Sequence, residues 1–511
     1  MARSGTGRWT RSGRGQAHRG TGRASGTRVG SLGAVVVIVM AAVVAVTSGS
    51  PPSSASTSSA RAAGIAALNK ASRSSRGVSK TTINVVFPVS NLTVLSSNFG
   101  FAGDTEFAAQ TRAIHTFVNA ANAHGGINGR KIKAMIVPFD PTNEAGMRAD
   151  CLQWTKGTPP VFAVVDGLGS WAGDNQLCIT QEGHTPFIGQ WTTTTNWINE
   201  GAPYLWWTGP DQASILSTLV AWAKGAKLVG GTRKVAIVAG DRASDQSALN
   251  KYLLPDLKRA GIAKPMIETI PADPSDTAST GAAAPLIVQH LQAAGITSVI
   301  PLMPFNAMFP YLQAEFQEKY YPKLLLSDYE GSIESALGLI PVPYEKELNG
   351  QEGVTVETLG GTDAPPTAVS KGGYDPGVEN CYKVWHAANP KPLPGQTLIH
   401  GEKPSPYIEE QGPIAAWCQG IELFATAARK AGRNLTRRSF VEAMASIKTF
   451  QGTFSPSLSY GPGKYAGPDE YQVVAIHNNV PPSSACVLTY QKKTQGTCWQ
   501  VIHSWRPLVT G

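Results

Sequence analysis

Two successive series of alternating strand and helix patterns constrain the fold of this chain more than any other feature. In the first series, β-branched apolar runs lie at 82–88, 131–139, 161–165 and 185–188. Between them, segments with three- and four-residue apolar spacing predict helices at 104–124, 143–156 and 173–182. A strand such as 161–165 is apolar throughout, which is typical of a parallel sheet covered by helices on both faces.

The alternation starts again after Gly209-Pro210. The second series predicts helices at 211–227, 244–260, 283–294 and 306–319, and strands at 234–239, 265–270, 298–302 and 323–326. Later patterns predict a strand at 354–356, helices at 374–388, 412–432 and 436–447, a strand at 471–476 and a hairpin near 486–499.

We therefore expect an α/β fold of two Rossmann-like lobes with parallel sheets joined by a hinge. Residues 81–209 would begin lobe 1, residues 210–345 would form most of lobe 2, and residues 346–511 would return to complete both.

The first 80 residues have the layout of an export segment. Seven arginines lie between Arg3 and Arg28, and the apolar run Leu32–Val46 follows them. A run of about 15 residues suits a signal peptide better than a bilayer-spanning helix. We expect a signal peptide or an uncleaved signal anchor, followed by a Ser/Pro/Ala tether. No cysteine precedes Cys151, so we expect no lipoprotein cysteine, and the remaining chain should be extracytoplasmic, either secreted or tethered.

The positive net charge does not indicate a nucleic-acid partner. Of the 44 Lys and Arg residues, 12 lie in residues 1–80, where Asp and Glu do not occur. The rest of the chain has 32 basic and 35 acidic residues, so its net charge is near −3. A nucleic-acid-binding protein concentrates positive charge on its folded surface, and this chain places the excess in its leader.

Six cysteines fit an oxidising compartment. Fifteen complete pairings are possible, and spacing favours the three local ones: Cys151–Cys178, Cys381–Cys418 and Cys486–Cys498. A metal site is the alternative. It has little support, because the sequence has no C-x-x-C motif and no histidine at ligand spacing from these cysteines.

The segment Asn119–Ile132 reads Asn-Ala-Ala-Asn-Ala-His-Gly-Gly-Ile-Asn-Gly-Arg-Lys-Ile. It resembles the signature of the branched-chain amino acid and amide family of ABC-transporter substrate-binding proteins, which includes leucine/isoleucine/valine-binding proteins. The order of elements from about 82 to 358 is similar to that family throughout, whereas the region from 359 is longer and richer in proline. The resemblance implies the type I periplasmic-binding-protein architecture.

In such folds ligands bind beyond the carboxyl ends of the strands. In lobe 1, the resemblance implies that Phe99 is an aromatic wall and that Ser170 holds a ligand carboxylate. Trp191, Thr192 and Thr193 match positions that contact ligand backbone atoms. Trp171 lies in the same loop as Ser170 and is a further candidate for the cleft, because tryptophan offers a large apolar face.

In lobe 2, the resemblance makes Glu330 the acidic anchor for a ligand ammonium and Phe305 an aromatic that packs over the solute. Asp328 and Tyr329 share the loop of Glu330 and are further candidates. Asp245 stands near the position where the family usually has a tyrosine. This departure favours a ligand that is more cationic or more hydroxylated than an aliphatic amino acid.

The resemblance implies a solute-binding protein that captures a small amino-acid-like or amide solute and delivers it to an ABC permease. We expect a monomer that uses no cofactor, metal or nucleic acid. One alternative is a membrane-anchored sensory module of the same fold. Another is an enzyme on a two-lobe scaffold, although the chain has no G-x-S-x-G, H-E-x-x-H or P-loop motif.

Overall fold

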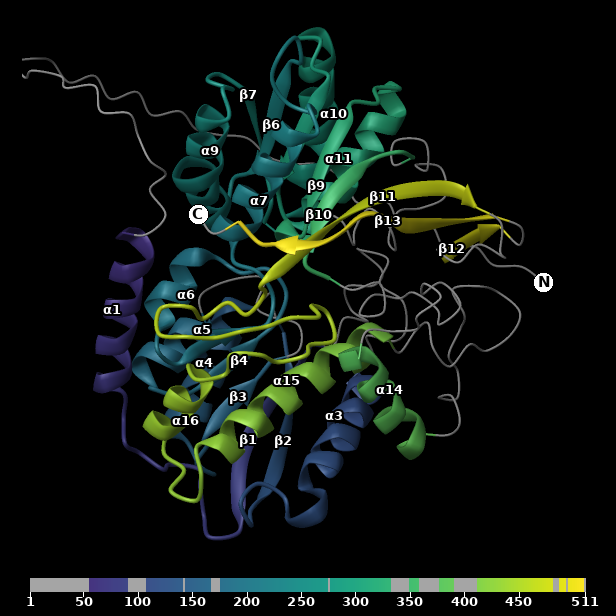
Figure 1. The fold of residues 1–511 in the computed structure, drawn as a ribbon. Coiled ribbons are helices and arrows are strands. Elements are labelled where there is room, and N and C mark those ends of the chain that lie inside the picture. The colour runs from purple at the N-terminus through teal and green to yellow at the C-terminus, as the bar shows by residue number, and fades with distance from the viewer. Residues whose placement is uncertain are drawn as a thin grey trace, which may run out of the picture. The chain divides into compact units, whose positions relative to one another are not determined.

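The computed structural model describes residues 55–90, 107–140, 143–166, 175–273, 276–331, 349–357, 376–389, 411–480, 487–492 and 495–509. Two sheets organise these residues (Figure 1). A five-stranded sheet has the order β2-β1-β3-β4-β5, and an eight-stranded sheet has the order β12-β13-β11-β10-β9-β8-β6-β7. Each sheet with its helices is called a lobe below, lobe 1 and lobe 2 respectively. The predicted α/β class with mostly parallel sheets is confirmed.

All strands of the first sheet are parallel. They are β1 (Thr82–Ser90), β2 (Lys131–Phe139), β3 (Ala163–Val165), β4 (Phe187–Gly189) and β5 (Leu205–Trp207). The helices between them are α3 (Phe107–Asn122), α4 (Glu144–Lys156), α5 (Asn175–Leu177) with a π-helical turn (Cys178–Glu182), and α6 (Thr195–Gly201).

The turn after α3 uses glycine for its backbone geometry, as the family-like motif predicts. Gly126 and Gly129 have φ values of 65° and 87°. A Cβ at Gly126 would lie 2.2 Å from the carbonyl oxygen of Arg130, so a side chain there would collide with the backbone. The motif therefore sets the connection between α3 and β2, while the expected ligand loops lie at the other ends of the strands.

Lobe 2 contains five parallel strands that are extended by antiparallel ones. The parallel strands are β6 (Val235–Gly240), β7 (Met266–Ile270), β8 (Ser298–Leu302), β9 (Lys323–Ser327) and β10 (Glu352–Thr355). The helices are α7 (Gln212–Gly225), α8 (Ala243–Ala248), a π-helical turn (Leu249–Leu253), α9 (Leu254–Arg259), α10 (Thr277–Ala293), α11 (Phe305–Glu318) and a short 3-10 turn (Tyr329–Gly331).

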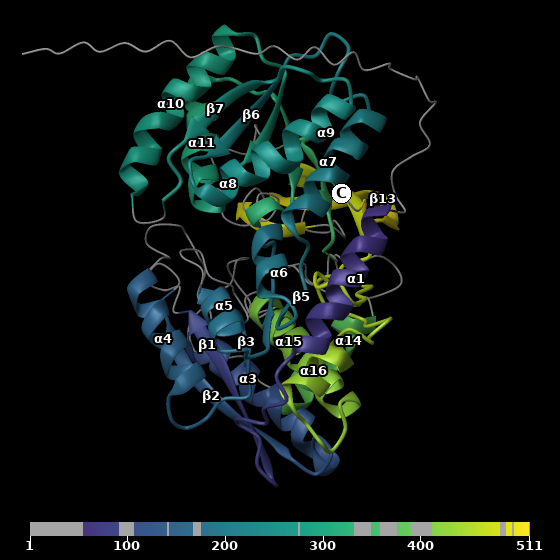
Figure 2. The ribbon, with the colours of Figure 1, turned by 90° about the vertical axis from the view of Figure 1, so that its left-hand side faces the viewer.

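Residues of β6 alternate between two buried clusters, as expected for a strand covered on both faces. Ala236 and Val238 belong to the cluster that includes α10 and α11, while Ile237 and Ala239 belong to the cluster that includes α7 and α9. Figure 2 shows α10 and α11 on one side of β6 and β7, and α7 and α9 on the other. This two-sided burial explains why these strands read as continuous apolar runs.

The chain beyond residue 349 contributes to both lobes. Strand β11 (Glu470–Val480) pairs antiparallel with β10, and β13 (Gln495–Pro507) and β12 (Val487–Lys492) extend that sheet. Helices α14 (Pro376–Ala388), α15 (Gln411–Lys430) and α16 (Arg437–Met444) contribute buried side chains to the core of lobe 1. The boundaries between the segments of the two lobes, expected at 209/210 and 345/346, stay predictions.

Three elements differ from the sequence expectations. α6 and β5 were not expected, and β5 is only three residues long. α10 begins at Thr277, where Asp276 caps it by accepting a hydrogen bond from the Ser279 N–H. The expected helix at 283–294 therefore corresponds to the later part of α10, which contains Pro285.

The expected tether is partly folded. Residues Ala55–Lys70 form helix α1, and Leu68 and Ala71 join the buried core of lobe 1. The N–H of Ser72 donates to the hydroxyl of Tyr204 at 2.6 Å. An alanine-rich segment has high helix propensity, so it orders once one side can be buried. In the described part of the chain no helix is both long and apolar enough to cross a bilayer.

Two of the three expected disulfides are present. Cys151–Cys178 and Cys381–Cys418 have Cα–Cα distances of 6.2 Å and 6.0 Å, within the usual range for a disulfide. Cys486 lies outside the described residues, so its pairing with Cys498 stays a prediction.

Candidate functional site

Loops from the two lobes meet at the carboxyl ends of β4 and β9, where ligands of open α/β folds are expected. The hydroxyl of Thr192, after β4, donates a hydrogen bond to the carbonyl oxygen of Asp328, after β9. This contact joins residues that are 136 positions apart in sequence. The predicted site residues Thr192 and Asp328 are therefore brought together.

The position of Trp191 depends on a glycine in the connection between the lobes. Trp191 has a positive φ of 66°, and its carbonyl oxygen accepts a hydrogen bond from the indole N–H of Trp207. A Cβ on Gly209 would lie 1.9 Å from that same carbonyl oxygen. Glycine at 209 thus permits the close approach of the Trp191 loop to the connecting segment.

On the lobe 2 side, one guanidinium is shared by two carboxylates. Arg242 makes a bidentate pair with Asp245, with N–O distances of 2.8 Å and 2.9 Å, and contacts Glu330 at 3.1 Å. The hydroxyl of Tyr329 donates to Asp245 at 2.6 Å and accepts from the side-chain amide of Gln212 at 3.0 Å. These five residues are called the Arg242 cluster below.

Burial and mutual charge set the protonation of the cluster. Burial raises the pKa of Glu330, while the Arg242 charge opposes the rise. Burial alone would lower the pKa of Arg242, but the charges of Glu330 and Asp245 outweigh it and raise that pKa further. Burial and the Asp245 charge raise the pKa of Tyr329, so its phenol keeps its proton.

Asp328 is a buried acid next to the cluster. Its carboxylate accepts a hydrogen bond from the Val356 N–H at 2.6 Å. Burial raises the pKa of Asp328 to about 7, although the hydrogen bonds from Val356 and Thr355 oppose the rise. Asp328 thus changes charge near neutral pH.

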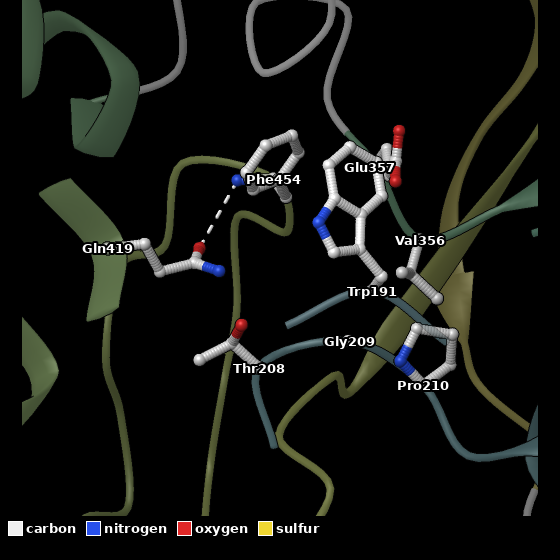
Figure 3. A pocket seen from close by; sticks show the side chains of 8 residues that line it. All are labelled: Trp191, Thr208, Gly209, Pro210, Val356, Glu357, Gln419 and Phe454. Carbon is white, nitrogen blue, oxygen red and sulfur yellow. Dashed lines mark hydrogen bonds between the residues drawn. The ribbon is translucent and has the colours of Figure 1, made fainter. Parts of the chain in front are cut away.

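A small pocket lies beside these loops, with a cavity volume of about 10 Å³. Figure 3 shows the side chains that line it. The lining comes from lobe 1, from the Gly209-Pro210 connection and from the end of β10: Trp191, Thr208, Gly209, Pro210, Val356, Glu357, Gln419 and Phe454. Among the described residues that line the pocket, Glu357 is the only one with an ionisable side chain, and it is 6% exposed.

Two aromatic rings and one amide shape the pocket. The ring centroids of Trp191 and Phe454 are 5.2 Å apart, with planes inclined at 50°. The Oε1 of Gln419 accepts from the Thr453 N–H at 2.7 Å and from the Phe454 N–H at 3.2 Å. These two bonds fix the orientation of the amide. Its buried Nε2 has no hydrogen-bond partner among the described residues.

The expected site residues divide into three groups. Trp191, Thr192, Asp245, Asp328, Tyr329 and Glu330 lie in the loops and cluster described above. Thr193 is buried, and its N–H donates to the Pro210 carbonyl at 3.2 Å. Phe99, Ser170 and Trp171 lie outside the described residues, as does the side chain of Phe305, the first residue of α11. The ligand contacts assigned to all of them stay predictions.

Sequence reasoning missed several residues of this region. Arg242 lies between β6 and α8, three residues before Asp245, so the rule about carboxyl ends of strands would have found it. Glu357, Gln419 and Phe454 lie beyond residue 345, where the sequence has no recognised motif that places them at the site.

Residues 88–317 match a family model described as periplasmic binding protein. Among solved structures, the chain is similar to a fatty acid ABC transporter substrate-binding protein from Thermomonospora curvata, with 15% identity, a TM-score of 0.55, and coverage of 84% of this chain and 93% of that one. It is also similar to an ABC-transporter solute-binding protein from Rhodopseudomonas palustris BisB5 in complex with 3,4-dihydroxybenzoic acid, with 14% identity, a TM-score of 0.56, and coverage of 84% and 98%.

A third similar structure is a branched-chain amino acid ABC transporter protein from Thermus thermophilus with bound valine, with 10% identity, a TM-score of 0.57, and coverage of 85% of this chain and 98% of that one. At these identities the likeness establishes the fold. A search of curated proteins gave no match.

Proposed function

We propose that this chain, whose residues 88–317 match the periplasmic binding protein family model, delivers a small solute to an ABC permease. It acts outside the cytoplasm, binds without chemical conversion and works as a monomer. The observation that carries the proposal is the meeting of loops after β4 and β9, where Thr192 contacts Asp328 beside an aromatic-lined pocket.

The proposed mechanism is binding between the lobes. A ligand that contacts the Trp191 loop of lobe 1 and the Arg242 cluster of lobe 2 stabilises the arrangement in which both surfaces are close. Because the ligand makes both sets of contacts only in that arrangement, it shifts the equilibrium towards the closed form. The permease then recognises the closed form.

Relatives of this fold differ in the solutes that their descriptions name, which include a fatty acid, a dihydroxybenzoate and valine. We propose a polar solute with an amine or several hydroxyl groups for this chain. The support is that two carboxylates, those of Asp245 and Glu330, share one guanidinium in the Arg242 cluster, and that Glu357 lines the pocket. These carboxylates suit a ligand that donates hydrogen bonds better than one that carries a carboxylate of its own.

A thermal-shift screen of the purified chain against amino acids, amides, polyamines, sugars and aromatic acids tests this proposal. We expect at least one amine-bearing or hydroxylated solute to raise the melting temperature in a concentration-dependent way. A ligand at a hundredfold excess over its Kd stabilises the folded state by about 2.7 kcal/mol. No shift with any class of solute would contradict the binding function.

A further inference from the structure

Three segments of lobe 1 are rich in basic residues and contain no acidic one. Residues 70–81, 122–133 and 428–438 have 12 Lys and Arg residues and no Asp or Glu. Eight of these 12 belong to residues 81–511, which have 32 basic and 35 acidic residues in all. When the eight are set aside, 24 basic and 35 acidic residues remain, with a net charge near −11. The small net charge of this part of the chain therefore conceals a strong separation of charge.

Hydrogen bonds hold the three segments side by side. Each bond ends on a main-chain carbonyl of another segment: the Lys131 N–H donates to Thr81 at 2.8 Å, the Asn128 amide to Arg429 at 3.0 Å, and the Arg437 N–H to Ser74 at 2.9 Å. Figure 1 shows β1 and β2 beginning at this end of lobe 1, with Thr82 and Lys131 opposite each other in the register. The three segments thus form one surface, called the basic face below.

Most cationic side chains of the basic face are exposed. The exposed ones are Lys70, Arg73, Lys80, Lys131, Lys133, Arg429, Lys430 and Arg433. Of the 12, only Arg438 makes an ion pair within the described part of the chain, with Glu442 at 2.8 Å. Neighbouring cations without counter-ions create a positive potential that attracts an anionic partner.

The basic face lies at the opposite end of the lobe 1 sheet from the candidate solute site. It includes the amino ends of β1 and β2, whereas the Trp191 loop follows the carboxyl end of β4 in the same parallel sheet. A partner on the basic face would therefore leave the solute site open.

The composition of the basic face indicates the chemistry of its partner. Its three segments contain no Phe, Trp or Tyr, so they lack the aromatic rings on which nucleic-acid bases stack. None of the large apolar side chains exposed on the described residues lies in these segments, so the face has no group that would insert into a hydrocarbon layer. Clustered Lys and Arg side chains without apolar anchors suit the anionic headgroups of a lipid surface.

We propose that the basic face docks lobe 1 on a membrane surface rich in anionic phospholipid. The docked protein stays at the membrane while its solute site faces away from the lipid. The attraction is electrostatic, so it weakens as salt screens the charges. The inference concerns a surface that the solute does not touch, and it goes beyond the proposed transport function.

Charge reversal tests the inference, with one substitution in each segment. The full chain carrying Lys80→Glu, Lys131→Glu and Arg433→Glu is compared with wild type in flotation with phosphatidylcholine vesicles, with and without phosphatidylglycerol. The matched control reverses three exposed lysines of lobe 2, in the variant K224E/K258E/K264E, and so changes the net charge equally. All variants keep the arginines of residues 1–28, so a difference between the two triple variants reports the basic face.

We expect wild type to bind the phosphatidylglycerol vesicles much more tightly than pure phosphatidylcholine, and less tightly as salt rises. K80E/K131E/R433E should weaken that binding about tenfold or more, since each basic residue near an anionic surface contributes substantially, and the control variant should weaken it less than threefold. Circular dichroism checks that both triple variants are folded.

Three outcomes would overturn the inference. Equal effects of the two triple variants would show that the basic face has no special part in binding. Equal binding of wild type to both kinds of vesicle would exclude anionic lipid as the partner. Tighter binding of poly-L-glutamate than of vesicles, compared per charge, would assign the face to an acidic protein. The experiment uses no solute, so its failure leaves the proposed solute-binding function standing.

Discussion

At the residue scale, Arg242 lies where a single substitution leaves two carboxylates without their counter-ion. Asp245 has no exposed side-chain surface, and Glu330 is largely shielded. Removing the guanidinium with Arg242→Met should lower the free energy of unfolding by about 3 kcal/mol, since breaking a buried pair leaves uncompensated charge. Urea unfolding of the purified variant measures this loss.

The Arg148–Glu182 pair supplies the control for this prediction. It is also bidentate, but its side chains are 51% and 44% exposed. Arg148→Met should cost less than about 1 kcal/mol, because solvent screens an exposed pair. Adding Asp245→Asn to R242M should restore part of the stability. Equal effects of R148M and R242M would show that the Arg242 cluster is not electrostatically special.

Asp328 provides a pH-dependent prediction. Below pH 3.8, the ordinary pKa of an aspartate, its carboxyl is protonated in both the folded and the unfolded chain. Between that pH and about 7 the unfolded chain releases this proton while the folded chain keeps it, so stability falls as pH rises. We expect wild type and Asp328→Asn to be about equally stable at pH 4. At pH 8 the variant should be more stable, by up to about 4 kcal/mol.

Chemical unfolding at pH 4, 5.5, 7 and 8 gives the two stability curves. The Asn side chain keeps an oxygen that can accept from the Val356 N–H, so the comparison isolates the charge. Parallel curves for wild type and D328N over this range would contradict the raised pKa of Asp328.

At the element scale, the sequence predicts what depends on local pattern and misses what depends on distant packing. The strand at 161–165 was predictable because its residues are buried on both faces, and the turn at Gly126 because only glycine fits there. α1 was missed because its own pattern is weak, and it is ordered by contacts with lobe 1. β5 is likewise too short to show a period.

The same distinction separates the predictable part of the site from the rest. Thr192 and Asp328 follow strands of the recognisable βα series, so the rule about strand ends placed both. Glu357, Gln419 and Phe454 reach the pocket through a return of the chain from β10, α15 and the segment after α16. No local sequence pattern predicts that these three segments come back to the pocket. The Cys381–Cys418 bond is the exception, since its spacing indicated that α14 and α15 lie close together.

At the scale of the whole molecule, the hydrogen bond from Thr192 to the Asp328 carbonyl links the two lobes directly. If ligand binding requires the lobes to be close, this bond stabilises the binding-competent form. Thr192→Val keeps the shape of the side chain but loses the donor, at a net cost of about 1 kcal/mol. The closed population, and with it the apparent affinity for any ligand that spans the lobes, should fall about fivefold.

The neighbouring residue is a matched control for T192V. The Thr193 hydroxyl is buried without a hydrogen-bond partner among the described residues, so Thr193→Val removes a hydroxyl without removing a bond. Calorimetric titration should show weaker ligand binding for T192V than for T193V. X-ray scattering should show a larger radius of gyration for T192V at subsaturating ligand, because fewer molecules are closed. A loss of affinity without any change in scattering would mean that Thr192 contacts the ligand itself rather than holding the lobes together.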